Sequence, residues 1–204
     1  ATSSVLENQT LGIDVNATDA DGDSLTYSIA GGADQAKFDL NSSTGVLTFK
    51  AAPDFETNGS VAGSSAYQVT IQVTDGTSPV TQSVTVTVTD QNEVPSFFSS
   101  SSSSVLENHT FVLDLNGTDA EGDALTYSIA GGADQTKFDI NSSTGVLTFK
   151  VAPDFEANAS SAGNNVYQVT VQVTDGNSPV TQSVTVTVTD QNEVPPNAAP
   201  SFVS

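Results

Sequence analysis

The sequence contains no cysteine, methionine or tryptophan, and lysine supplies all four of its basic side chains. Without cysteine, disulfides and thiolate metal sites are excluded. The chain also has no apolar run of the ~18 residues that a membrane-spanning helix needs. It does not open with the basic and then apolar stretch that forms a secretory signal. We therefore expect no membrane insertion in this fragment. We also expect the localisation signal and the anchor to belong to a longer chain.

Negative charge is what the chain has in excess. It has 204 residues, of which 24 are acidic, and its formal net charge is −20. So few basic side chains cannot neutralise a phosphate backbone, which argues against nucleic acid as a partner and against anionic membrane surfaces. Acidic chains with few aromatic residues are often disordered, but the alternating hydrophobic runs described below contradict disorder. The acidic side chains therefore point to divalent cations as counter-charges.

Two near-copies of one unit make up the chain. When residues 1–95 are aligned with residues 101–195, 74 positions are identical, and residues 80–95 match their copy without a change. An internal repeat of this length indicates a tandem array of domains. We predict a first repeat over residues 1–95, a second over residues 96–195, and the stub of the next linker over residues 196–204.

Each unit has the pattern of an all-β domain. Apolar residues alternate with polar ones over residues 67–73 and 84–88, which places valines on one face of a strand and polar side chains on the other. Short apolar runs recur at roughly ten-residue spacing between turn clusters, as in a β-sandwich. In the first unit we expect strands near Val5 and over residues 11–15, 25–30, 38–40, 46–49, 67–73 and 84–88. The predicted fold class is all-β, with two tandem seven-stranded Greek-key β-sandwiches.

The segments between the strands carry turn signals. Residues 41–45 supply the asparagine and glycine of a tight hairpin, and residues 30–37 have room for one loose turn. A run of six serines follows Phe97 and Phe98. Such a run is either a flexible linker or the start of the first edge strand of the second unit. We favour the edge strand, and we expect the rings of both phenylalanines to dock against the protein.

Acidic residues recur at the predicted strand ends, and such ends gather at the poles of an antiparallel sandwich. One set in the first unit consists of Glu7, Asp54, Glu56, Asp90 and Glu93. A second set, at the opposite pole of the second unit, consists of Asp119, Glu121, Asp123 and Asp175. Calcium takes about six to eight oxygen ligands from carboxylates, amides and backbone carbonyls. A solvated acidic surface is the usual alternative, but recurrence at a fixed offset favours a calcium-bridged hinge across residues 90–97, formed by stacking the two sets.

At these positions the chain resembles the cadherin repeat family, and its bacterial cadherin-like members in particular. The family's glutamate–asparagine pair matches Glu7-Asn8, and its aspartate–x–glutamate signature matches Asp54-Phe55-Glu56. Its linker signature matches Asp90-Gln91-Asn92-Glu93 followed by Pro95-Ser96-Phe97. Its aspartate–alanine–aspartate signature matches Asp19-Ala20-Asp21 and, in the second unit, Asp119-Ala120-Glu121, while its late aspartate matches Asp75 and Asp175.

The resemblance covers nearly the whole chain and implies calcium ions at the junction of the two units. The implied ligands are Glu7, Asp54, Glu56, Asp90 and Glu93 on the lower side, Asn92, Asp119, Glu121 and Asp175 on the upper side, and the backbone carbonyls of Gln91 and Val94. Glu93 and Glu121 stand where the family has aspartate, so their side chains are longer. The unpaired poles would form weak partial sites, from Asp19, Asp21 and Asp75 at one end and from Glu107, Asp154, Glu156, Asp190, Asn192 and Glu193 at the other.

For function, the resemblance implies a calcium-rigidified adhesion or spacer segment of a large extracellular or cell-surface protein. Three roles remain open: a spacer, self-association (homophilic adhesion) with other cadherin-like repeats, and a carbohydrate-binding module that attaches to polysaccharide. Animal adhesion cadherins often exchange a strand anchored by tryptophan, which this chain lacks. Sugar platforms usually need exposed aromatics, whereas the four tyrosines fall in strand patterns. We expect no enzyme activity, because the single histidine, His109, has Gln9 at the equivalent position.

Overall fold

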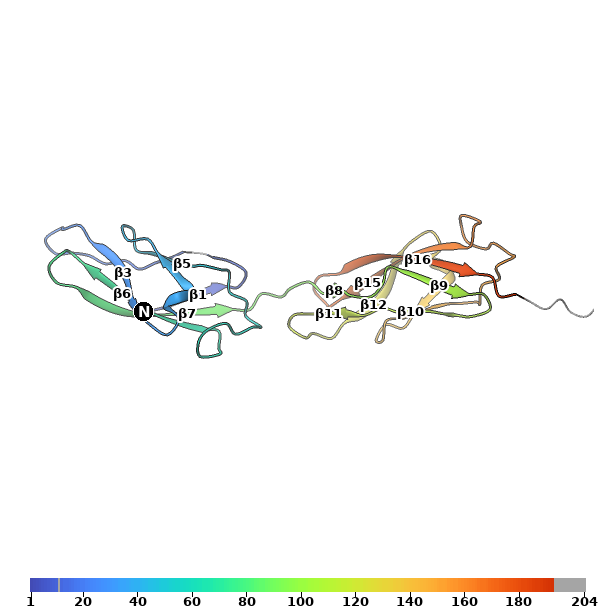
Figure 1. The fold of residues 1–204 in the computed structure, drawn as a ribbon, viewed down its shortest axis with the longest axis horizontal. Helices are drawn as coiled ribbons and strands as arrows, with labels where there is room; N and C mark the ends of the chain where they lie inside the picture. Colours follow the sequence, from blue (N-terminus) through green and yellow to red (C-terminus); the bar gives the residue numbers. More distant parts are fainter. Residues whose placement is uncertain (11, 193–204) are drawn as a thin grey trace, which may run out of the picture. The chain divides into compact units, whose positions relative to one another are not determined.

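The computed structural model of the chain describes residues 1–10 and 12–192. The chain forms two compact units, and the boundary between them lies between Asn92 and Glu93 (Figure 1). The predictions made for Leu11, for Glu193 and for the stub at residues 196–204 fall outside the described residues. Within the described part of the chain, no helix has the length and hydropathy that a membrane crossing requires.

The first unit, over its described residues, is built from seven strands in two sheets. The strands are β1 (Thr2–Leu6), β2 (Ile13–Asp14), β3 (Thr26–Gly31), β4 (Phe38–Leu40), β5 (Val46–Phe49), β6 (Ala66–Thr74) and β7 (Val80–Thr89). One sheet has the order β1-β7-β6-β3 and the other has the order β2-β5-β4. A single 3-10 turn, η1 (Gln35–Lys37), precedes β4 and confirms the turn expected within residues 30–37. The predicted set of strands is thus confirmed for this unit.

Strands that follow one another in the chain often belong to different sheets, which makes the unit a Greek-key sandwich. β1 and β3 lie in one sheet, and β2 and β4 lie in the other. β1 runs parallel to β7, with Val5 opposite Val88. The end of the first strand therefore lies beside the end of the last one, and residues that follow both strands are brought together.

Alternating side chains build the core between the sheets. In β6 the side chains of Tyr67, Val69 and Ile71 are buried, whereas Gln68 is exposed. The ring of Tyr67 meets the ring of Phe49 edge-on, with 5.0 Å between the centroids. Each large apolar side chain that is fully buried contributes about 1.5–3 kcal/mol. This core holds the strand ends in place, and the acidic residues of interest follow those ends.

The second unit repeats this sandwich and adds a two-stranded ribbon. Its strands are β8 (Ser96–Phe97), β9 (Ser102–Leu106), β10 (Phe111–Asp114), β11 (Gly117–Thr118), β12 (Thr126–Gly131), β13 (Phe138–Ile140), β14 (Val146–Phe149), β15 (Val166–Thr174) and β16 (Val180–Thr189), with η2 (Gln135–Lys137) before β13. The sheets have the orders β12-β15-β16-β9 and β10-β14-β13, and the ribbon pairs β11 with β8. The chain is therefore all-β, with two tandem sandwiches of one topology.

The serine run begins the edge strand of the second unit. Residues 102–104 belong to β9, which runs parallel to β16 with Ser102 opposite Thr185, so the favoured interpretation is confirmed. Phe97 packs against the core of this unit. Phe98, however, is 66% exposed, and the prediction that it docks is wrong. Successive side chains of an extended segment point to opposite sides, so the chain buries only one of the two rings.

Candidate metal-binding clusters

A buried glutamate organises one end of the first unit. Glu7 follows β1 and is only 1% exposed. Its Oε2 accepts a hydrogen bond from the backbone N–H of Phe55 at 2.8 Å, and its Oε1 accepts one from the backbone N–H of Gln91 at 2.8 Å. One carboxylate therefore joins the start of the unit to the loop after β5 and to the segment after β7.

Two further acids stand beside Glu7. One carboxylate oxygen from each of Glu7, Asp54 and Glu56 lies within 4.8 Å of the other two. The turn at Asp54 is held locally, because its Oδ1 accepts the backbone N–H of Thr57 at 2.8 Å. Asn8 has a φ of 59°, a left-handed conformation that asparagine tolerates. Its backbone N–H donates to the carbonyl of Pro53 at 2.8 Å, which draws the two segments together.

The second unit has the same cluster. Glu107 is fully buried and accepts hydrogen bonds from the backbone N–H groups of Phe155 and Gln191, each at 2.9 Å. Carboxylate oxygens of Glu107, Asp154 and Glu156 lie within 4.8 Å of one another. Three of the residues expected to form the partial site at this pole are thus brought together.

Two pKa values describe the electrostatics of this second cluster. The backbone N–H of Phe155, followed by that of Gln191, lowers the pKa of Glu107 from its ordinary value. The pKa of Glu156 is raised: a hydrogen bond from its own backbone N–H lowers it, but desolvation and the charges of Glu107, Asp190 and Asp154 outweigh that effect. The cluster therefore holds one firmly ionised carboxylate among neighbours that repel one another, an arrangement that a cation would relieve.

A different acidic group lies before β12 in the second unit. The Oε1 of Glu121 accepts the backbone N–H of Glu93 at 3.1 Å, and the Oδ1 of Asp119 accepts the backbone N–H of Asp123 at 3.0 Å. The second oxygens, Oδ2 of Asp119 and Oε2 of Glu121, are buried and have no hydrogen-bond partner. The pKa of Glu121 lies below its ordinary value, chiefly because of a hydrogen bond with the Glu93 side chain. Burying an unpaired carboxylate oxygen is costly, so this donor set fits a cation.

The late aspartates cap turns. In the first unit the Oδ1 of Asp75 accepts the backbone N–H groups of Thr77 at 2.7 Å and of Ser78 at 3.0 Å. The bond from Ser78, then those from Thr77, lower the pKa of Asp75 to about 2. Asp175 makes the corresponding bonds in the second unit. Turn capping thus accounts for part of the role of Asp175, and its predicted role as a calcium ligand stays a prediction.

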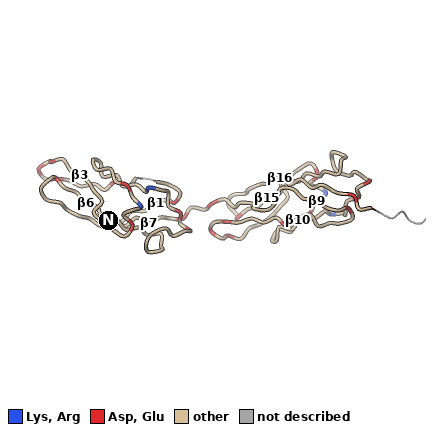
Figure 2. The backbone as a smooth tube through the Cα atoms, viewed as in Figure 1, with Lys and Arg blue, Asp and Glu red and all other residues tan. Residues whose placement is uncertain are grey.

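The remaining predicted ligands lie in the segment that follows β7. Asp90, Gln91 and Asn92 are exposed, and the structure ties the Gln91 backbone to Glu7. Val94 is 58% exposed and precedes a buried proline, Pro95. The shared use of calcium by this segment and by the Asp119 group stays a prediction. Figure 2 shows Asp and Glu in the loops at both ends of each sandwich.

One pair of acids was not singled out from the sequence. Asp34 is 1% exposed, and its carboxylate accepts the backbone N–H groups of Val61 at 2.6 Å and of Gln68 at 2.8 Å. Asp134 does the same in the second unit. These acids pin the long loop after β5 to the following strand, so their role is structural. The sequence indicates this pair only through the identity of residues 31–35 with residues 131–135.

Comparison with known proteins gives a consistent result. The family model described as "Cadherin domain" matches residues 2–89 and again residues 101–189. Human Protocadherin-15 is 32% identical over 200 residues, which cover 90% of this chain and 10% of that protein. Protocadherin Fat 2 of Rattus norvegicus is 33% identical over 184 residues, covering 83% of this chain and 4% of its own length. The chain thus spans a tenth or less of these relatives, which are protocadherins and not enzymes.

Solved structures agree on the fold. The crystal structure of human Protocadherin-24 EC1-2, Form II, superposes with a TM-score of 0.62 at 23% identity, covering 93% of this chain and 95% of that one. The crystal structure of human CDH23 EC21-23 gives a TM-score of 0.57 at 23% identity, covering 94% of this chain and 67% of that one. At this level of identity the likeness concerns the tandem fold alone.

Proposed function

The chain belongs to the cadherin family, and we propose that it is a calcium-binding pair of cadherin domains acting as an adhesion or spacer segment of a large cell-surface protein. The relatives support this proposal because they are protocadherins of much greater length. The extracellular or cell-surface location is part of the same proposal. Among the three roles left open by the sequence, family membership supports adhesion and spacing.

The observation that carries the proposal for calcium is the pair of buried, unpaired oxygens on Asp119 and Glu121. An ionised oxygen without a partner in a buried place is destabilising unless a cation or a donor satisfies it. Calcium suits the site because it accepts carboxylate and carbonyl oxygens in flexible geometry. The carboxylate groups around Glu7 and Glu107 support the same reading, since each gathers three acids within 4.8 Å.

The chain's own residues prepare these groups for a cation. Both carboxylate oxygens of Glu7 accept hydrogen bonds from backbone N–H groups. These two bonds fix the loop that carries Asp54 and Glu56, and the segment after β7. The residues that would hold calcium are those predicted: Glu7, Asp54, Glu56, Asp90, Gln91, Asn92, Glu93, Val94, Asp119, Glu121 and Asp175. When bound, calcium supplies positive charge that neutralises the carboxylates. We expect this to limit bending of residues 90–97.

Calorimetric titration with calcium tests the proposal. The double variant Asp119→Asn with Glu121→Gln should lose the tightest binding while both sandwiches remain folded. A matched control, Asp39→Asn with Asp139→Asn, removes the same charge from exposed carboxylates that lie near Lys50 and Lys150. The control should bind calcium as the natural chain does. A natural chain that takes up no calcium at millimolar concentration would contradict the proposal.

Polysaccharide binding receives no support from the structure or from the relatives. All four tyrosines, Tyr27, Tyr67, Tyr127 and Tyr167, are at most 8% exposed. A sugar platform needs aromatic faces that are open to the ligand. The tyrosines instead belong to the cores, as their strand patterns predicted.

A further inference from the structure

One sheet of each sandwich contains no charged residue. This is the larger sheet, β1-β7-β6-β3 in the first unit and β12-β15-β16-β9 in the second. None of the residues in these strands is acidic or basic, although 24 of the chain's 204 residues are acidic. The smaller sheets do carry acids, with Asp14 and Asp39 in the first unit and Asp114 and Asp139 in the second. The acids are therefore kept away from one sheet of each unit.

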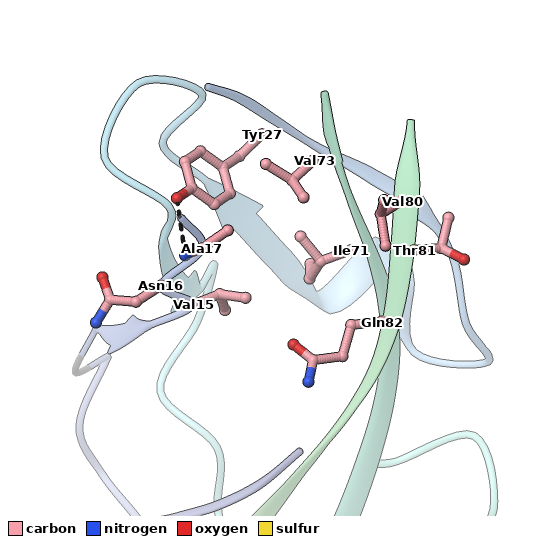
Figure 3. Close-up of a pocket in the computed structure, with 9 residues that line it drawn as sticks. All are labelled: Val15, Asn16, Ala17, Tyr27, Ile71, Val73, Val80, Thr81 and Gln82. Atoms are coloured by element: carbon pink, nitrogen blue, oxygen red, sulfur yellow. Dashed lines mark hydrogen bonds between the residues drawn. The ribbon is translucent and has the colours of Figure 1, made fainter. Parts of the chain in front are cut away.

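The two sides of the larger sheet have different chemistry. On the inner side of the first unit, Ile71 and Val73 of β6 lie toward Val15 and line an open pocket of about 310 Å³ (Figure 3). Successive side chains of a strand point to opposite sides, so Thr70 and Gln72 lie on the outer side. Strand β7 behaves in the same way, because its three buried valines alternate with hydroxyl side chains. The outer side of the larger sheet is therefore a polar but uncharged surface, which we call the neutral face.

The side chains of the neutral face form rows that cross the sheet. Thr85 of β7 lies opposite Thr2 of β1 and opposite Gln68 of β6. In a neighbouring row Ser83 lies opposite Thr70. Residues paired directly across two strands have their Cβ atoms about 5 Å apart. The face is thus a closely spaced array of hydroxyl and amide groups.

The second unit repeats this face. Thr185 lies opposite Ser102 of β9 and opposite Gln168 of β15. Each neutral face also has one exposed leucine near its end, Leu6 in the first unit and Leu106 in the second. Both leucines follow a buried valine in an edge strand, so they lie on the outer side. Each face therefore combines uncharged polar groups with an apolar side chain, a composition that suits a protein interface.

Hydrogen-bond chemistry makes the neutral face complementary to itself. A hydroxyl group and a side-chain amide each donate and accept hydrogen bonds, whereas an ionised carboxylate only accepts them. Two neutral faces can therefore satisfy one another, while two acidic surfaces cannot. The net charge of −20 favours the same surface, because copies of such a chain repel one another. A contact between neutral faces sets no carboxylate of either sheet against another.

The size of the face suits a weak and reversible contact. Strand β6 has nine residues, so the face measures about 30 Å along this strand and about 15–20 Å across its four strands. Two such faces in contact bury about 1,000 Å² in total, which is the size of a transient protein interface. A second copy of this chain therefore fits the neutral face in hydrogen bonding, in charge and in area.

We propose that two copies of this chain associate through their neutral faces. The proposal names the contact surface for the adhesion role proposed above and rests on that role. Like faces meet, so a two-fold axis can relate the two copies and close the pair. Sheets that pack face to face lie about 10 Å apart with their strands nearly aligned, and short serine and threonine side chains allow this approach. The exposed leucine of each face is covered in the same contact.

Sedimentation of the full chain from micromolar to millimolar concentration tests the proposal, with calcium and with a chelator. The natural chain should associate in both, and more strongly at high salt, because salt screens the repulsion between copies. The variant Thr85→Glu with Thr185→Glu places like charges in both neutral faces and should weaken association by about tenfold or more. The matched control, Thr48→Glu with Thr148→Glu, adds the same charge to the smaller sheets at threonines that are also half-buried. It should associate nearly as well as the natural chain does.

A second measurement needs no variant. The side-chain amide NMR signals of Gln68 and Gln168 should move as the concentration of the natural chain rises, because both groups lie on the neutral faces. The side-chain amide of Asn41 provides the reference, since it lies in the exposed turn between β4 and β5 and should not move. Circular dichroism checks that both double variants remain folded.

Three results would overturn the proposal. The natural chain stays monomeric at millimolar concentration in high salt, or the two folded double variants associate equally well. The third is that association requires calcium or is weakened by salt, which would mean that the contact runs through the acids. Calcium titration of the same chain separates this proposal from the calcium proposal. A chain that binds calcium but stays monomeric contradicts only the contact surface, and a chain that associates without taking up calcium contradicts only the metal sites.

Discussion

The Oε1 of Glu7 lies 2.8 Å from the backbone nitrogen of Gln91, and 84 residues separate the two in the sequence. The same carboxylate also accepts the N–H of Phe55. Glu107 repeats both bonds with Gln191 and Phe155. Each unit thus uses a buried acid to close its sandwich, and two further acids lie beside it, Asp54 and Glu56 in the first unit and Asp154 and Glu156 in the second.

Asp34→Asn should destabilise the first unit by about 1–3 kcal/mol. The carboxylate of Asp34 accepts two backbone N–H groups, and an amide replaces one of its acceptor oxygens by a donor that faces an N–H group. Urea unfolding measures the change. The control Asp39→Asn alters a side chain that is 69% exposed and should change stability by less than about 0.5 kcal/mol. Equal effects of the two variants would contradict the structural role of Asp34.

The stability of the second unit in chelator should fall as acid is added. The folded state lowers the pKa of Glu107, so protonation favours the unfolded chain. The contribution is fully present above the ordinary glutamate pKa of about 4.3 and is lost as the pH falls through the lower folded value. Urea unfolding at a series of pH values between about 6 and 3 should show this loss. Glu107→Gln should flatten that part of the profile, and an unchanged slope would count against the assignment.

Calcium should raise the unfolding temperature, and magnesium should raise it much less. A site that binds only the folded chain adds about 2.7 kcal/mol when free calcium is a hundred times its dissociation constant. Magnesium demands a tighter octahedral geometry and keeps its waters, so it fits loosely spaced carboxylates poorly. Thermal unfolding followed by circular dichroism, with each ion at equal ionic strength, measures the difference. Equal shifts for the two ions would indicate general charge screening and no specific site.

The same substitution should have unequal effects in the two units. Val173 is fully buried, so Val173→Ala should cost about 1–3 kcal/mol through lost burial and a new cavity. Val73→Ala should cost clearly less, because Val73 borders an open pocket and is only partly buried. Urea unfolding of both variants, with NMR signals to assign each unit, gives the comparison. Equal costs would mean that the pocket is closed in solution.

Much of the fold follows from local patterns in the sequence. The alternation of residues 67–73 and 84–88 predicts β6 and β7, and the turn residues at 41–45 predict the hairpin between β4 and β5. Local patterns suffice here because side chains of a strand alternate whatever the partner strand is. The docking of Phe98 was wrongly predicted from its apolar character, because the direction of one ring depends on the strand that pairs beside it.

The sequence by itself determined the repeat, the strands, the family and the positions of the acidic residues relative to strand ends. Only the tertiary structure decided which acids lie together. The parallel pairing of the first and last strands brings Glu7 to the backbone of Gln91, and the hydrogen bond from Phe55 brings Glu7 to the loop that carries Asp54 and Glu56. It also distinguished Asp34, whose carboxylate holds a loop through backbone N–H groups, from the acids that we propose as calcium ligands. Finally, it distinguished two units of nearly identical sequence. Burial of Val73 and Val173 depends on whether a neighbouring segment covers them, which is a property of the folded chain and not of either valine.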